Sequence, residues 1–382
     1  MDLQLSESES AFQAEARNWL AANVPAEPLP SLDTPDGFRL HQEWEAKLAA
    51  ARWSVVSWPA AYHGREASLV EWVVFEEEYY RAGAPGRVSQ NGIFLLAPII
   101  FEHGTTDQQD RFLPSMATGE RIWAQCWSEP EAGSDLASLR STARRDDARG
   151  GWVLNGQKIW CSRAALAHWG FGLFRSDPEA QKHAGLTYFL FPLDAEGVTV
   201  RPIAQLDGEA GFAEVFFDDV FVPDADVLGE PGDGWRVAMS TAGNERGLSL
   251  RSPGRFTAAA DRLLALYDER PDPRAADRVV DAWLRAEAYR LYTWGTVTRL
   301  REGGDVGAAG SVNKVWWSEL DIALHETALD LLGPDAEVES TWLDGYTFSL
   351  SGPIYAGTNE IQRNIVAERI LGLPREPKGV QK

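Results

Sequence analysis

The pattern of apolar and polar positions divides the chain into a helical first part, a strand-rich middle and a helical last part. Up to about position 118 apolar residues recur at helical spacing, and Ser6-x-x-Glu9 has the pattern of a capping box at the start of the first helix. From about Arg121 to Leu228 the apolar positions alternate, which is typical of short strands. From about Gly234 onward the helical spacing returns.

The clearest turn signal in the middle part is the pair Asn155-Gly156, inside the apolar run from Trp152 to Trp160. An Asn-Gly pair between apolar runs favours a two-residue hairpin turn, because both residues tolerate positive φ. We therefore expect a hairpin there. Strands between two helical blocks predict an α+β chain with three domains, at residues 1–118, 119–229 and 230–382.

Charge and composition exclude several classes of function. The formal net charge is -21 and the sequence pI is about 4.7, so no nucleic-acid partner is expected, because phosphate backbones need basic surfaces. The N-terminus lacks the basic and apolar regions of a signal peptide, and no apolar run is long enough to span a membrane. Cys126 and Cys161 do not suggest a disulfide scaffold and fit a reducing cytoplasm. His325-Glu326 lacks the second histidine of a zinc motif, and no metal site is expected.

The stretch from Ile354 to Gly372 combines a turn with a helix. Gly357 and Thr358 break the chain, and Thr358 or Asn359 can cap the helix that follows. The free N–H groups and the positive dipole at a helix N-terminus favour a polar or anionic ligand. Most turn-and-helix units only support a fold, so the pattern alone identifies no ligand.

Three stretches together are similar to the acyl-CoA dehydrogenase family, flavoenzymes that introduce a double bond between Cα and Cβ of an acyl thioester. The last stretch matches the family's C-terminal signature at Tyr355, Gly357, Thr358, Ile361, Gln362 and Arg363. The others are Ala124–Ala143 and Gly156–Ser162, which by residue type alone fit a polar turn and a strand with a packed tryptophan. The resemblance covers nearly the whole chain. It implies an N-terminal helical domain, a middle β-barrel-like domain and a C-terminal four-helix bundle.

The resemblance implies FAD as the cofactor and an acyl-CoA as the substrate. It implies flavin contacts at these positions: Gln125, Trp127, Ser128, Trp160, Ser162, Thr358 and Glu360. Trp160 matches the tryptophan beside the isoalloxazine, and Ser162 matches the hydroxyl residue at flavin N5. Ser134, Arg246 and Gly357 are implied in binding the substrate.

The position of the catalytic base departs from the commonest family pattern. Many members carry a glutamate between the Tyr and the Gly of the signature, and here that residue is Ala356. Members such as isovaleryl-CoA dehydrogenase carry it on the first helix of the C-terminal domain, directly before an arginine. Glu245-Arg246 stands at that place, so the resemblance implies Glu245 as the base. It also implies that the Ala356 N–H binds the substrate carbonyl. By residue type alone, Glu245 equally fits a solvated glutamate on a charged helix.

The family resemblance also implies partners and leaves alternatives open. An electron-transfer flavoprotein is the expected electron acceptor. Many members have an Arg-x-x-Phe-Gly run that binds the FAD of a neighbouring subunit, whereas this chain has Arg270-Pro-Asp-Pro-Arg274 in that region. A homodimer, a homotetramer and a heterotetramer therefore stay open. Two other functions stay open, a flavin-dependent monooxygenase or oxidase of the same fold, and a non-catalytic subunit of a heteromeric enzyme. The acyl group is not determined.

Overall fold

The computed structural model describes residues 3–246 and 252–375, with 241–246 described by their backbone only. The chain forms two compact units. The first contains Phe12–Phe75 and Ala82–Glu245, and the second contains the described parts of Met1–Ala11, Glu76–Arg81 and Arg246–Lys382. Within the described residues, no helix is both long enough and apolar enough to cross a bilayer.

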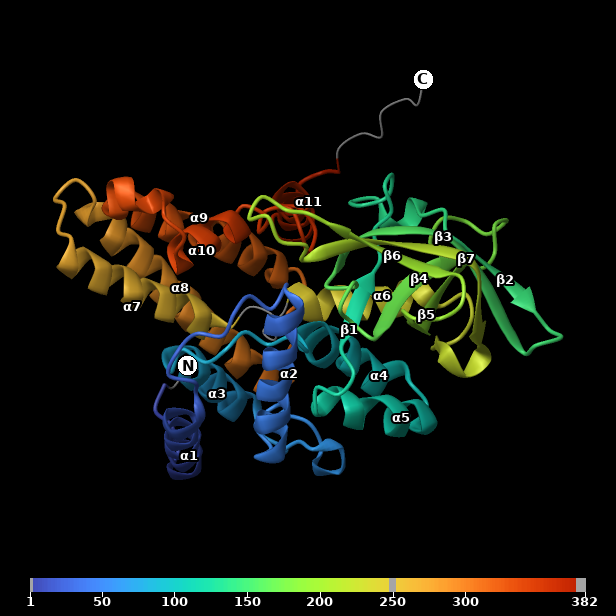
Figure 1. Ribbon diagram of the computed structural model, residues 1–382, viewed down its shortest axis with the longest axis horizontal. Coiled ribbons are helices and arrows are strands. Elements are labelled where there is room, and N and C mark those ends of the chain that lie inside the picture. Colours follow the sequence, from blue (N-terminus) through green and yellow to red (C-terminus); the bar gives the residue numbers. More distant parts are fainter. Residues whose placement is uncertain (1–2, 247–251, 376–382) are drawn as a thin grey trace, which may run out of the picture. The chain divides into compact units, whose positions relative to one another are not determined.

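The N-terminal third of the chain is helical, as its spacing predicts (Figure 1). Its helices are α1 (Glu7–Asn23), α2 (Pro35–Ala50), α3 (Leu69–Arg81), a π-helical segment (Asn91–Leu96), α4 (Ala97–His103) and α5 (Thr106–Ala117). The predicted capping box is confirmed, because the Ser6 N–H donates to Glu9 Oε2 at 2.8 Å and the Glu9 N–H donates to Ser6 Oγ at 3.2 Å. These bonds satisfy donors that the first helical turn leaves free.

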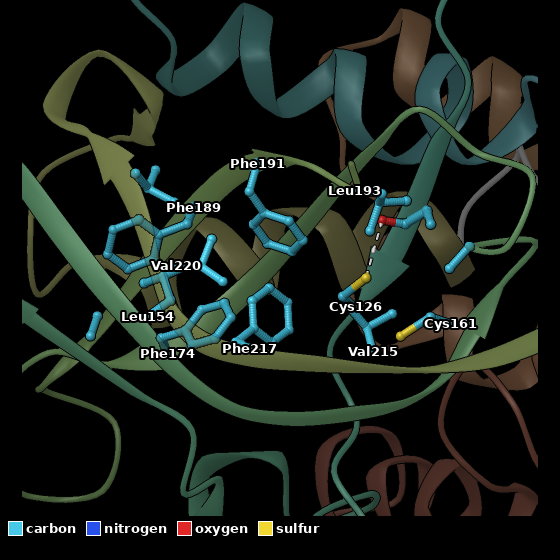
Figure 2. Packing of buried hydrophobic residues seen from close by; sticks show 14 of the residues in the cluster. Cys126, Leu154, Cys161, Phe174, Phe189, Phe191, Leu193, Val215, Phe217 and Val220 are labelled. Atoms are coloured by element: carbon cyan, nitrogen blue, oxygen red, sulfur yellow. Dashed lines mark hydrogen bonds between the residues drawn. The ribbon is translucent and has the colours of Figure 1, made fainter. Parts of the chain in front are cut away.

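The middle of the chain forms one sheet, whose strands follow the order β6-β7-β3-β2-β4-β5-β8, with β1 paired in parallel to β4. The strands are β1 (Trp123–Cys126), β2 (Thr142–Asp146), β3 (Gly151–Ser162), β4 (Trp169–Arg175), β5 (Leu186–Pro192), β6 (Val198–Ile203), β7 (Phe212–Pro223) and β8 (Val227–Leu228). Helix α6 (Gly234–Arg246) follows. Figure 2 shows the core of the sheet, where Phe174 lies edge-to-face against Phe191 and Phe217.

The predicted hairpin at Asn155-Gly156 is wrong. β3 runs through this pair without turning, and its pairing with β7 only shifts register between Leu154 and Gly156. The Asn155 side chain exchanges two hydrogen bonds with Asp219 of β7 instead of closing a turn. Gly156 has a φ of +139°, and a Cβ there would lie 2.3 Å from Ser141 Oγ. A glycine is therefore required at this position because Ser141, directly before β2, packs closely against it. The turn between β2 and β3 lies at residues 147–150.

The C-terminal unit is built on α9 (Ala309–Leu332), which contacts the other α- and π-helical segments described after residue 252. Those helices are α7 (Pro253–Glu269), α8 (Ala276–Arg301), α10 (Thr341–Ser349), α11 (Asn359–Ile365) and a π-helical segment (Val366–Ile370). Figure 1 shows α7, α8 and α9 side by side. The helix–strand–helix order of the α+β prediction is confirmed, and the exact domain boundaries stay a prediction.

A buried ion pair ties β3 to the loop that follows β1. Lys158 Nζ donates to Glu129 Oε1 at 2.8 Å and to the Leu173 carbonyl at 2.7 Å, and the Lys158 side chain is 0% exposed. Glu129 also accepts the N–H groups of Arg140 at 2.6 Å and Ser141 at 2.9 Å. Burial by itself raises the pKa of Glu129, but the Lys158 ammonium and these N–H donors hold it below its usual value.

Removing the lysine should destabilise the protein strongly. Lys158→Met leaves the Glu129 carboxylate buried without its cation, which costs about 3–5 kcal/mol in the free energy of unfolding. Chemical denaturation measures the change. Arg39→Ala is the matched control, because the Arg39–Glu43 side chains are 58% and 61% exposed and such a pair contributes roughly 0–1 kcal/mol. Equal losses in the two variants would show that the buried pair is not stabilising.

The same pair predicts how stability depends on pH. Because the pKa of Glu129 is lower in the folded protein than in the unfolded chain, its ionisation stabilises the fold above the unfolded pKa. That contribution is lost as the pH falls through the lowered pKa. Glu129→Gln should therefore be less stable than the wild type near neutral pH, with a smaller further loss on acidification. Thermal melts from neutral to acidic pH test this, and parallel curves for the two proteins would contradict it.

Candidate functional site

Trp160 is the most unusual of the predicted flavin contacts. It lies in β3 with a φ of +61° and is 55% exposed, with its ring edge-to-face against Phe212 at 6.0 Å. The pairing of β3 with β7 shifts register between Lys158 and Cys161, both of which are fully buried. Trp160 lies inside this irregular stretch, where regular pairing is interrupted and a side chain can be re-aimed outward.

Strand β1 and the loop after it hold three further predicted contacts, Gln125 in the strand and Trp127 and Ser128 in the loop. The loop is fastened to β3 because the Ile159 N–H donates to the Ser128 carbonyl at 2.9 Å and Lys158 Nζ lies 3.4 Å from the Trp127 carbonyl. The structure thus brings this loop beside the strand that carries Trp160 and Ser162. These residues form one candidate region within the first unit, the Trp160 region.

Several polar groups of the Trp160 region are available to a ligand. Trp127 Nε1 is buried and has no hydrogen-bond partner among the described residues. A buried indole N–H without an acceptor is costly, so an acceptor atom of a bound group fits there. The half-exposed side chains of Gln125, Ser128 and Ser162 likewise form no hydrogen bond within the described chain. Ser134 lies exposed further along the loop.

The turn before α11, in the second unit, forms a separate candidate region. Ala356 and Gly357 have φ values of +57° and +78°, and Thr358 caps the helix, its Oγ1 accepting the Ile361 N–H at 3.3 Å. The buried Gln362 side chain holds this turn, because its Nε2 donates to the Ala356 carbonyl at 3.1 Å and lies 3.3 Å from that of Gly357. No described residue accepts a hydrogen bond from the Ala356 N–H. The predicted cap at Thr358 is confirmed, and the turn offers a free backbone donor.

Buried polar contacts on α9 fix the start of α11. Lys314 Nζ donates to Asn359 Oδ1 at 2.8 Å, and the Ser318 hydroxyl donates to the same oxygen at 3.2 Å. Arg363 forms an ion pair with Glu319 of α9. Glu360 is exposed, and its own backbone N–H and the Thr358 hydroxyl lower its pKa.

The side chains of two predicted site residues, Glu245 and Arg246, are not described by the structure. Both residues form the C-terminal end of α6. Sequence reasoning missed two other residues, Glu129 and Lys158, whose ion pair joins the loop after β1 to β3. The one sequence signal for them is a lysine inside an apolar strand, which alone does not identify its partner.

Comparison with known proteins identifies the family of the chain. Domain models of the acyl-CoA dehydrogenase family match residues 6–120 (N-terminal domain), 124–220 (middle domain) and 232–371 (C-terminal domain). Acyl-CoA dehydrogenase IpdE1 of Mycobacterium tuberculosis is 43% identical over 96% of this chain and 98% of its own length. IpdE1 of Mycolicibacterium smegmatis is 41% identical over the same shares.

Solved structures give the same result. A structure described as the Tcur3481-Tcur3483 steroid ACAD has a TM-score of 0.86 and 26% identity over 98% of this chain and 100% of that one. The ChsE4-ChsE5 complex from Mycobacterium tuberculosis has a TM-score of 0.83 and 27% identity, with the same coverage. The expected fold and the expected class, an oxidoreductase acting on a CH–CH bond, are confirmed, and the family match supports the expected cofactor FAD. The chain belongs to the acyl-CoA dehydrogenase family.

Proposed function

We propose that this protein catalyses the α,β-dehydrogenation of an acyl-CoA thioester, with Glu245 as the base. The observation that supports this best is the Ala356–Gly357 turn, whose Ala356 N–H has no hydrogen-bond acceptor among the described residues. A thioester carbonyl must be polarised before its α-proton becomes acidic enough to remove, and a preorganised backbone N–H does this. Alanine keeps that donor although it removes the glutamate that many family members have at this position.

Each residue has a separate part in the proposed reaction. The Ala356 N–H holds the thioester carbonyl, with Gly357, Arg246 and Ser134 binding other parts of the substrate. Glu245 takes the proton from Cα. FAD supplies the acceptor, flavin N5, for the hydride that leaves Cβ. Gln125, Trp127, Ser128, Trp160, Ser162, Thr358 and Glu360 hold that cofactor. The electrons then pass to an electron-transfer flavoprotein, in a reducing cytoplasm that fits the free cysteines Cys126 and Cys161.

The experiment is anaerobic flavin reduction. The purified FAD-containing protein is mixed with straight-chain, branched and steroid side-chain acyl-CoAs, the last because one structural relative is described as a steroid enzyme. We expect one class to bleach the flavin absorbance. Glu245→Gln should slow that bleaching by about 10²–10⁴-fold, the usual contribution of a general base. Glu230→Gln, an exposed glutamate before α6, is the control and should react at the wild-type rate. Bleaching that survives Glu245→Gln would remove this residue from its role.

A second candidate is a subunit of a heteromeric enzyme. The region that in many relatives binds a neighbour's FAD is here engaged within the chain, because Arg270 pairs with Asp335 at 2.6 Å and Arg274 with Asp272 at 2.8 Å. One structural relative is a two-protein complex, ChsE4-ChsE5. A flavin monooxygenase or oxidase has no comparable observation in its favour.

The oligomeric state separates the two candidates. A self-sufficient enzyme, expressed alone, should elute from size exclusion as a homodimer or homotetramer with one FAD per chain. A chain that needs a partner should elute alone with far less FAD and should fail to bleach with any acyl-CoA. Light scattering and flavin absorbance on one sample decide the question.

A further inference from the structure

Arg255 lies in the first turn of α7 and forms an ion pair with α9. Its Nη2 donates to Asp321 Oδ2 at 2.8 Å, and its side chain is 24% exposed whereas that of Asp321 is 2% exposed. Among the described residues, Asp321 is the one acceptor for this guanidinium. An arginine carries more N–H donors than a single such bond uses. Donors of Arg255 therefore stay available to a ligand that reaches its exposed part.

The surroundings of Arg255 are aromatic. Its Cζ lies 5.6 Å from the ring centroid of Phe256 and 5.4 Å from that of Phe348. Tyr80 and Tyr355 are near enough to interact with its charge. A cation among aromatic faces has lost part of its hydration, so an anionic oxygen ligand binds it more strongly there than in water.

Packing alone does not account for this charge. Asp321 also lies 3.4 Å from His325 Nδ1, so its carboxylate has a second neighbour besides Arg255. Replacing a buried ion pair by apolar residues is often neutral or stabilising. The Arg255–Asp321 pair therefore adds little stability to the packing of α7 on α9. It does fix the orientation of the Arg255 guanidinium.

Tyr355 connects this cluster to the carbonyl-binding turn. The ring centroids of Phe348 and Tyr355 are 6.2 Å apart, and Ala356 follows Tyr355 directly. If the Ala356 N–H holds the thioester carbonyl, as the proposed function has it, the acyl group begins beside the aromatic cluster. Arg255 then lies one aromatic ring beyond Tyr355, within the reach of substituents on that acyl group.

We propose that Arg255 is a specificity-determining residue that binds an oxygen substituent on the acyl group, a carboxylate foremost. A guanidinium matches a carboxylate in plane and in spacing, and such charge-assisted hydrogen bonds are stronger than neutral ones. The enzyme then favours acyl thioesters that carry a second acidic group over methyl-ended thioesters of the same length. This inference rests on the proposed dehydrogenase function.

The test compares ω-carboxyacyl-CoAs with methyl-ended acyl-CoAs of equal chain length, over a series of lengths, on the FAD-containing enzyme. In the wild type, kcat/KM for the carboxylate-bearing thioester should exceed that of its methyl-ended counterpart by about 10–100-fold at the best length. Arg255→Met should lower this ratio to about one or less, because a carboxylate among aromatic rings without a cation is unfavourable. Both rates come from one preparation, so the ratio does not depend on the folded fraction.

Three further variants make the result specific. Arg255→Lys keeps the charge beside Asp321 but not the planar fork, and should keep part of the preference. Arg262→Met changes an exposed arginine two turns further along α7 and should leave the ratio unchanged. Arg255→Met/Asp321→Asn removes both charges and gives the same ratio test if the single variant does not fold.

Two results would overturn the inference. One is a wild type that shows no preference for the carboxylate at any chain length. The other is a preference that Arg255→Met retains. Reduction of the flavin by methyl-ended acyl-CoAs in the same preparation would show that the dehydrogenase function itself holds in either case.

Discussion

The loop after β1 and strand β3, which carry Trp127 and Trp160, depend on the ion pair between Lys158 and Glu129. A fully buried ammonium requires a carboxylate, and this carboxylate in turn binds the N–H groups of Arg140 and Ser141. The pair therefore joins a loop to a strand at one fixed place. The register of β3 shifts between Lys158 and Cys161, and the exposed Trp160 lies within that shift. The ion pair thus links the loop that carries Trp127 to the strand that carries Trp160.

The turn before α11, in the second unit, is also held by buried polar side chains. Two successive residues with positive φ are an unfavourable start for a helix, and the buried Gln362 amide compensates by binding both of their carbonyls. Lys314 and Ser318 hold Asn359 from α9. In each of these two segments, buried polar side chains stabilise a backbone conformation that the segment would not adopt alone. Trp127 Nε1 and the Ala356 N–H have no hydrogen-bond partner among the described residues, so a ligand can accept a hydrogen bond from each of them.

Charge in this chain acts locally rather than globally. The net charge of -21 opposes the approach of an anionic CoA thioester, so any attraction must come from individual cations and N–H groups. Arg255 is such a cation, held by Asp321 and surrounded by aromatic rings that limit its hydration. Several other arginines are bound to exposed carboxylates, as Arg270 is to Asp335. The local setting of an arginine, and not the total charge, therefore decides which one can select a substrate.

The sequence by itself determined the features that depend on neighbours along the chain. The Ser6–Glu9 box, the Thr358 cap and the change from helical to alternating spacing are local patterns, and all of them appear in the structure. The motif resemblance led to the family. Only the tertiary structure decided that Asn155-Gly156 continues a strand, because Ser141 and Asp219, which lie elsewhere in the chain, determine that geometry. It also decided that Lys158 pairs with Glu129 and that Arg255 lies near Tyr355, since residues far apart in sequence meet only when packing brings their strands and helices together.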